Sequence, residues 1–141
     1  MNILFFLTPK SELSYIYDDD SLRQALEKME YHRYTAIPVI NRKGEYVGTI
    51  TEGDLLFCLK NQFSLNFRDA EKVQISEVSR RMNNRPIRID ADIEDLLQQS
   101  TNQNFVPVID DKNIFIGIVT RKDIIQYCIR RLKELGHKEE A

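Results

Sequence analysis

Two threonine–aspartate pairs with the same spacing carry the most specific chemistry in this chain. Thr51 precedes Asp54 by three positions, and Thr120 precedes Asp123 in the same way. Each pair follows a β-rich run and opens an apolar helical run, where free backbone N–H groups at the helix start favour a bound anion. A carboxylate there can accept hydrogen bonds from both hydroxyls of a ribose. The same spacing is also a capping box that needs no ligand, so the spacing leaves nucleotide binding and helix capping equally open.

The sequence around the two pairs is repeated. Residues 36–54 return at 105–123 without a gap, with proline, glycine, threonine and aspartate in register. Such repetition decides the architecture before any other feature of the chain. A single copy of about 60 to 70 residues would be only marginally stable, so we expect two copies of one small unit that share a core.

A strand and a capped helix are expected at the start of each copy. In the first copy the strand is expected at 15–17, and Ser21 with Gln24 forms a capping box that begins the helix. In the second copy the strand is expected at 87–89, and Asp92 caps the helix.

A hairpin and a second helix are expected to complete each copy. Gly44 and Asn113 occupy equivalent turn positions that suit a left-handed backbone. Pro38 and Pro107 are expected near strand starts, where a missing N–H does least damage to the ladder. The closing helices are expected at about 54–60 and 123–135. The order strand, helix, strand, strand, helix predicts an α+β fold.

The chain is predicted to divide into a first repeat at 1–60, a linker at 61–72 and a second repeat at 73–141. The linker is polar and mixed in charge, and residues 73–82 are expected to form a short helix that enters the second copy. The apolar residues 1–7 are too few for a membrane span and lack a basic start. We therefore expect them to dock on the fold, and we expect no export signal and no membrane association.

Composition narrows the function classes. The chain has 141 residues, 42% hydrophobic and 30% charged, with a net charge of −2, which favours a soluble folded protein and gives no electrostatic reason for nucleic-acid binding. Cys58 and Cys128 lie on apolar helical stretches and are expected to be buried thiols in a reducing cytoplasm. His32 and His137 are far from both in sequence, so no metal site is expected. Catalytic triad spacings and phosphate-binding glycine motifs are absent, and an enzyme is not expected.

The repeated segments resemble the cystathionine β-synthase (CBS) domain. The resemblance rests on a hydrophobic-Pro-hydrophobic strand at 37–40 and 106–109 and on a Gly-hydrophobic-hydrophobic-Thr-x-x-Asp strand end at 48–54 and 117–123. It covers roughly residues 7–132. Two CBS domains in tandem, a Bateman module, imply an α+β fold with pseudo-twofold symmetry and two related clefts for adenosine-containing ligands, with the aspartate on ribose and the threonine near phosphate.

The resemblance also implies site residues. Thr120 is followed by the basic pair Arg121 and Lys122, whereas Thr51 is followed by Glu52 and Gly53. An anionic phosphate prefers the basic pair, so the main site is expected beside Asp123, with a weaker or empty site beside Asp54. Residues before and within the two proline strands are expected to hold adenine, and residues of the opening strands line the same clefts: Tyr34, Thr35, Ala36, Ile37, Phe105, Val106 and Pro107, with Ser14, Ile16 and Arg88. For Tyr34 and Phe105, packing in the core is an equally open alternative.

The function implied is a non-catalytic module that senses an adenine nucleotide, forms a homodimer through helices of both repeats and modulates a separate effector protein. Stand-alone bacterial CBS proteins that bind cyclic di-AMP are similar to this chain, although Glu12 stands where that receptor has a lysine. AMP, ADP and ATP are expected as ligands on the same footing, with no cofactor besides the nucleotide. The alternative is a ligand-free interaction scaffold in which both Thr-x-x-Asp motifs only cap helices.

Overall fold

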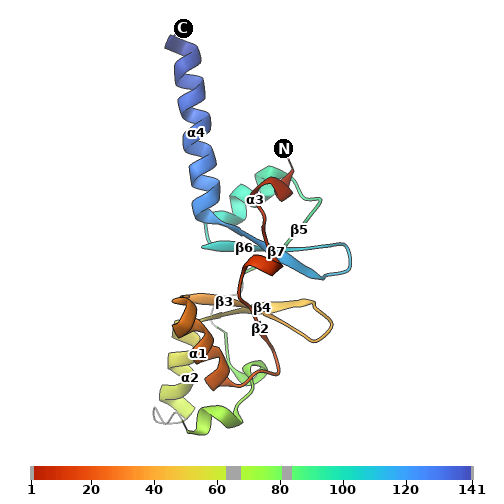
Figure 1. Ribbon diagram of the computed structural model, residues 1–141, viewed down its shortest axis with the longest axis vertical. Helices are drawn as coiled ribbons and strands as arrows, with labels where there is room; N and C mark the ends of the chain where they lie inside the picture. The colour runs from red at the N-terminus through yellow and green to blue at the C-terminus, as the bar shows by residue number, and fades with distance from the viewer. Residues whose placement is uncertain (1, 63–67, 81–83, 141) are drawn as a thin grey trace.

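The computed structural model describes residues 2–62, 68–80 and 84–140. It contains seven strands in two sheets, with helices on the outer face of each sheet (Figure 1). The strands are β1 (Thr8–Pro9), β2 (Ile16–Tyr17), β3 (Ala36–Ile40), β4 (Tyr46–Thr51), β5 (Ile87–Arg88), β6 (Phe105–Ile109) and β7 (Phe115–Thr120). The α-helices are α1 (Leu22–His32), α2 (Glu52–Gln62), α3 (Ile93–Ser100) and α4 (Arg121–Glu140). Short 3₁₀ turns are η1 (Ile3–Phe6), η2 (Lys10–Glu12), η3 (Asp69–Lys72) and η4 (Ile75–Glu77).

The two sheets repeat one topology. The first has the order β2-β3-β4 and the second the order β1-β7-β6-β5. In each repeat the short opening strand pairs in parallel with the proline strand, which pairs antiparallel with the last strand. Both ladders also shift register before the last residue of the proline strand, after Val39 and after Val108. The predicted order of strand, helix, strand, strand, helix is therefore confirmed.

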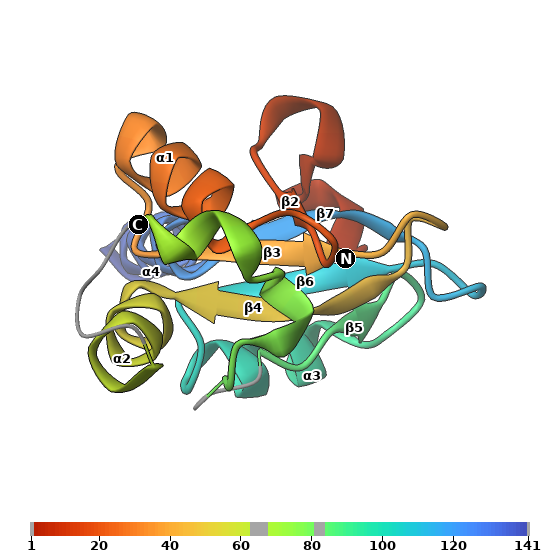
Figure 2. The same ribbon diagram turned by 90° about the horizontal axis from the view of Figure 1, so that it is seen from below.

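The sheets meet at the centre of the molecule. Figure 1 shows α1 and α2 beyond the first sheet and α3 and α4 beyond the second, and Figure 2 shows the sheets overlapping in the perpendicular view. The two hairpins bond to each other: the Tyr46 N–H donates to the Asn113 carbonyl at 3.3 Å and the Phe115 N–H to the Gly44 carbonyl at 2.9 Å. The two turn residues have φ of 86° at Gly44 and 65° at Asn113, which confirms the predicted left-handed positions.

The two prolines correct one expectation. Pro38 and Pro107 lie at the third position of their five-residue strands, opposite Thr49 and Ile118, rather than near the strand starts. The ladder tolerates them because the pairing of the opening strand begins only at the next residue, Val39 or Val108. The missing proline N–H therefore costs no hydrogen bond to β2 or β5, because neither strand has begun to pair at that position.

The N-terminal segment belongs physically to the second repeat. β1 pairs with β7, and Ile3 and Phe6 are buried in the same hydrophobic cluster as Ile87 and Leu96. A Cβ on Gly117 would collide with the Thr8 carbonyl oxygen, so glycine is required where β1 pairs with β7. Although these residues lie at the start of the first repeat in sequence, the predicted docking segment thus docks on the second repeat.

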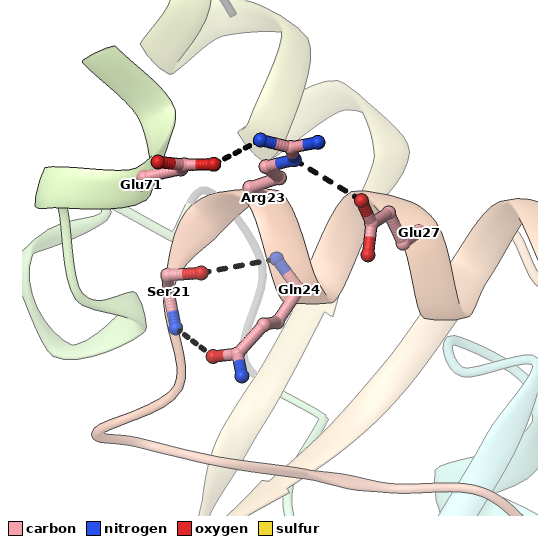
Figure 3. Close-up of polar contacts among 5 residues, drawn as sticks. All are labelled: Ser21, Arg23, Gln24, Glu27 and Glu71. Atoms are coloured by element: carbon pink, nitrogen blue, oxygen red, sulfur yellow. Dashed lines mark hydrogen bonds and ion pairs between the residues drawn. The ribbon is translucent and has the colours of Figure 1, made fainter. Parts of the chain in front are cut away.

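The segment between the repeats packs on the first one. Ala70, Ile75 and Val78 are buried in the core of the first repeat. Arg23 on α1 forms an ion pair with Glu71 of η3 and another with Glu27 at 3.1 Å (Figure 3). The short helix expected at 73–82 is reduced to the 3₁₀ turn η4, and residues 81–83 lie outside the described residues.

One of the two predicted caps and one of the two cysteines differ from expectation. The Ser21 hydroxyl accepts from the Gln24 N–H at 3.1 Å and the Gln24 side chain accepts from the Ser21 N–H at 2.8 Å, which confirms the capping box (Figure 3). Asp92 occupies the N-cap of α3, but its side chain makes no capping hydrogen bond. Cys58 is buried as expected, whereas Cys128 is exposed because it lies in the part of α4 after Tyr127, where no described residue is buried.

Candidate functional site

The two Thr-x-x-Asp motifs lie at the junctions between β4 and α2 and between β7 and α4. Both helices begin directly after the threonine, at Glu52 and Arg121, two residues earlier than predicted. In the first repeat the Thr51 N–H donates to Asp54 Oδ2 at 3.0 Å, and the Asp54 N–H donates to Thr51 Oγ1 at 3.1 Å. Asp54 is only 2% exposed. The first motif is therefore a closed, reciprocal capping box.

The second motif is only half of that arrangement. The Asp123 N–H donates to Thr120 Oγ1 at 3.2 Å, so the hydroxyl caps α4. Across the described part of the chain, however, the Asp123 carboxylate accepts no hydrogen bond, and this residue is half-buried rather than fully buried. The second acid thus retains the acceptor capacity that a ribose needs.

A cavity of about 420 Å³ opens beside Thr120 and is lined by both repeats. Its volume falls within the range of ~300–1,000 Å³ that small-molecule sites occupy. Six of the predicted site residues line it, namely Ser14, Tyr34, Thr35, Ala36, Phe105 and Thr120. Seven further residues complete the wall: Thr8, Glu12, Leu13, Arg33, Pro38, Asn104 and Ile118. Segments that are far apart in sequence therefore meet around one hollow.

The cavity beside Thr51 is much smaller. It measures about 110 Å³ and is lined by Ala36, Thr51, Asn84, Asn102, Gln103, Asn104 and Phe105. Gln103 is buried there and bonds to the backbone of Arg85 through both ends of its amide, at 3.1 and 3.2 Å. Side-chain amides thus take up room beside Thr51 that remains open beside Thr120.

The predicted basic pair does not face the larger cavity. Arg121 Nε donates to the Ser100 carbonyl at 2.8 Å, which satisfies an unpaired acceptor at the end of α3. Lys122 is exposed, and neither side chain is part of the cavity wall. The cation in the wall is Arg33, which follows α1 with a left-handed φ of 56°. Sequence reasoning missed Arg33, although its position at a helix end next to Tyr34 could have indicated it.

The other predicted residues lie behind or outside the cavity. Ile16, Ile37 and Val106 are fully buried in the two cores, and Pro107 is also buried. Their side chains support the walls. Arg88 is exposed and pairs with Asp90 at 3.3 Å, away from the larger cavity.

Tyr34 fixes one wall of the larger cavity. Its hydroxyl accepts a long hydrogen bond of 3.4 Å from the Ser14 N–H, and its ring stacks on His32 with the centroids 5.3 Å apart. The ring also packs against the core of the first repeat. Tyr34 therefore packs on the core of the first repeat and also lines the larger cavity.

Neither a metal-binding cluster nor a membrane-spanning helix occurs in the described part of the chain. Within residues 2–62, 68–80 and 84–140, His, Cys, Asp and Glu side chains form no group of three or more that could hold a metal ion. Over the same residues, none of the helices has both the length and the apolar character that crossing a bilayer requires.

Two copies of this strand-helix-strand-strand-helix unit, joined sheet to sheet, define a tandem module of the CBS type. The sequence profile of the CBS domain matches residues 7–61 and 75–130, so the chain belongs to the CBS domain family. A CBS domain-containing protein of Dictyostelium discoideum is 30% identical over 122 residues, which cover 82% of this chain and 83% of that protein.

Solved structures share the whole fold. A crystal structure of CbpB in complex with c-di-AMP matches with a TM-score of 0.85 and 24% identity, covering 98% of this chain and 91% of that chain. A crystal structure of CBSX2 in complex with AMP matches with a TM-score of 0.70 and 23% identity, covering 92% and 96%. The tandem CBS fold expected from the sequence is confirmed.

Proposed function

We propose that this chain is a non-catalytic regulatory module that binds an adenosine-containing ligand in the cavity beside Thr120. The observation that carries the proposal is the half-open motif whose threonine lines that cavity: Thr120 caps α4, while the Asp123 carboxylate has no hydrogen-bond partner among the described residues. Two proteins of the same fold were crystallised in complex with c-di-AMP and with AMP. The ligand class proposed for this chain is accordingly AMP, ADP, ATP or cyclic di-AMP.

Each part of the cavity has a role in this proposal. The start of α4 with Thr120 receives phosphate, since the helix dipole favours an anion there. Asp123 accepts from the ribose hydroxyls. Tyr34, Ala36 and Phe105 offer apolar and aromatic surface to adenine. Arg33 supplies the positive charge that the sequence had assigned to Arg121 and Lys122.

Ligand binding changes function only if it favours one arrangement of the protein over another. The cavity wall combines both repeats with the N-terminal segment, through Thr8 and Leu13. A ligand that bridges them alters how the helices on the outer faces are presented to a partner. We therefore propose a cytoplasmic homodimer whose nucleotide occupancy modulates an effector protein.

The second candidate is a ligand-free interaction scaffold. It is favoured by one observation, the closed capping box of Thr51 and Asp54, because a motif of this type can be satisfied internally. The two candidates differ in whether any adenine nucleotide stabilises the fold.

A thermal-shift panel with AMP, ADP, ATP and cyclic di-AMP tests the proposal. A ligand at a hundred times its dissociation constant adds about 2.7 kcal/mol to the free energy of unfolding. The shift should disappear in Thr120→Val and persist in the matched variant Thr51→Val, since both lose a cap but only Thr120 lines the larger cavity. If none of these nucleotides raises the melting temperature, the scaffold is the better description.

A further inference from the structure

Tyr34 and Gln103 occupy equivalent positions in the two repeats. Each lies two residues before its proline strand, β3 or β6. In both repeats the carbonyl of the following residue, Thr35 or Asn104, accepts a hydrogen bond from the first N–H of the closing helix, at 3.0 and 2.9 Å. The two side chains therefore start from the same place in the repeated unit, although one is an aromatic ring and the other is an amide.

Both side chains bind the same backbone position of the opening segment. The Tyr34 hydroxyl accepts from the Ser14 N–H at 3.4 Å, and Gln103 Oε1 accepts from the Arg85 N–H at 3.1 Å. Ser14 and Arg85 are equivalent as well, because each lies two residues before its opening strand, β2 or β5. Each side chain thus spans the gap between the start of the proline strand and the segment that leads into the opening strand.

The two side chains differ in length. The hydroxyl of tyrosine stands at the far end of a six-membered ring, so it lies farther from its own Cα than the amide oxygen of glutamine does. The ring of Tyr34 therefore keeps the two segments of the first repeat apart, whereas Gln103 holds the corresponding segments of the second repeat close together. We call Tyr34 the spacer and Gln103 the clamp.

The clamp is held by several hydrogen bonds. Gln103 Nε2 donates to the Arg85 carbonyl at 3.2 Å and to the Phe105 carbonyl at 3.3 Å, and the residue is only 8% exposed. Asn84 Nδ2 also donates to the Phe105 carbonyl, at 3.3 Å. From the first repeat, the Tyr46 hydroxyl donates to the Asn84 carbonyl at 2.7 Å. The segment at 84–85 is therefore fixed from both repeats.

The two cavities differ as the spacer and the clamp require. The cavity of about 420 Å³ is lined by Ser14 and the spacer, and the cavity of about 110 Å³ is lined by Asn84 and the clamp. Both cavities share Ala36, Asn104 and Phe105, so these three residues do not account for the difference in volume. Only the larger volume lies within the range of ~300–1,000 Å³ that small-molecule sites occupy.

We propose that the residue at this position decides which cleft admits a nucleotide. The spacer Tyr34 keeps the cleft beside Thr120 open, and the clamp Gln103 closes the cleft beside Thr51. The chain then holds one nucleotide, and the closed cleft serves as a fixed contact between the repeats. The number of nucleotides per chain rests on the proposed function, whereas the width of each cleft does not.

A crystal structure of the Gln103→Tyr variant without ligand tests the width. The introduced hydroxyl should take over the hydrogen bond from the Arg85 N–H, and the cavity beside Thr51 should widen from about 110 Å³ to ~300 Å³ or more. Gln103→Ala removes the clamp without adding a ring and should also widen the cavity, which covers the case that the tyrosine variant does not fold. A cavity of unchanged volume in the variants that fold would overturn the proposal.

Isothermal titration calorimetry with AMP counts the sites. The native chain should bind one AMP, and so should the control Asn102→Ala, which shortens another side chain of the smaller cavity. Gln103→Tyr should bind two, the second about tenfold to a hundredfold more weakly, because Asp54 is held in its capping box. Addition of Thr120→Val to Gln103→Tyr should leave only the weaker site.

The outcomes separate this proposal from the proposed function. Two AMP molecules per native chain, or one per chain in a Gln103→Tyr variant whose cavity has widened, would overturn the control of occupancy by the clamp. If the native chain binds no AMP while the cavity widens in Gln103→Tyr, the proposed function fails for AMP and the spacer and clamp stand.

The reverse substitution tests the spacer. Tyr34→Gln should narrow the larger cavity and weaken AMP binding about tenfold or more, because a short amide replaces the ring. Tyr34→Phe keeps the ring and loses only the long hydrogen bond of 3.4 Å, so its affinity should stay within about twofold of the native value. Equal losses of affinity in the two variants would show that the ring is not a spacer.

Discussion

Alanine substitutions of the two equivalent acids, Asp54 and Asp123, should have different effects, one on the stability of the fold and the other on ligand affinity. Asp54→Ala removes the carboxylate that accepts from the Thr51 N–H at 3.0 Å in a buried position. Asp123→Ala removes a carboxylate that accepts no hydrogen bond among the described residues. The first change should therefore weaken the fold, and the second should weaken nucleotide binding.

The magnitudes follow from the environment of each acid. Loss of a helix cap costs about 1 kcal/mol, and a partly buried N–H without its acceptor costs about 1 kcal/mol more. For a chain of this size, about 2 kcal/mol corresponds to a melting temperature roughly 6 to 10 °C lower in Asp54→Ala. Asp123 contributes mainly through the helix dipole, worth about 0.5 kcal/mol, so its variant should melt within about 2 °C of the native chain.

Ligand affinity should show the reverse order. Hydrogen bonds to a charged group contribute about 1.5–3 kcal/mol, so Asp123→Ala should weaken nucleotide binding by about tenfold to a hundredfold. Asp54→Ala should keep the native affinity within about twofold. Isothermal titration calorimetry and thermal melting of the three proteins measure both quantities. Equal losses of affinity in the two variants, or a large loss of stability in Asp123→Ala, would refute the assignment of roles.

Three further perturbations have defined outcomes. Gly117→Ala should lower the melting temperature, because the added Cβ collides with the Thr8 carbonyl oxygen. Gly136→Ala is the control and should not lower it, because an added Cβ meets no atom within 4 Å there. Equal melting temperatures of the two variants would contradict this packing. Burial raises the pKa of Tyr46 from 10.0 to about 12, so the stability that this group contributes should be complete below about pH 10 and fall as the pH rises toward 12. Urea titration at about pH 9 and pH 11 measures the free energy of unfolding, which should fall less between these two pH values in Tyr46→Phe than in the native chain. An unchanged pH dependence in Tyr46→Phe would argue against this role of Tyr46. Glu12→Lys should strengthen binding of ADP and ATP relative to AMP in calorimetry, because a wall acid becomes a base; an unchanged ratio would remove Glu12 from the site.

Local patterns predicted much of the fold. The capping box of Ser21 and Gln24 and the left-handed turns at Gly44 and Asn113 are confirmed because each depends on neighbours within a few residues. The repeated Thr-x-x-Asp motif predicted the position of both helix starts to within two residues. Local interactions of this kind act in the same way wherever the segment lies in the molecule.

The candidate site was predicted only in part. Six of the predicted residues surround the larger cavity, but Arg121 bonds instead to Ser100 at the end of α3. Sequence alone could not show this, because the orphan carbonyls of one helix are satisfied by a side chain from another element. The position of Arg33 in the cavity wall also depends on tertiary structure. Arg33 directly follows α1 and precedes Tyr34, and both line the cavity together with residues of the second repeat.

The sequence by itself determined that one small unit occurs twice, with its caps and turns, because those features depend on residue type and spacing along the chain. The tertiary structure decided which of two identical motifs is closed. Asp54 is buried within its own capping box, while Asp123 lies in the first turn of α4, a helix that begins directly after Thr120, and Thr120 lines a cavity of about 420 Å³. The difference arises from burial and from partners distant in sequence, and neither of these is specified by a motif of four residues.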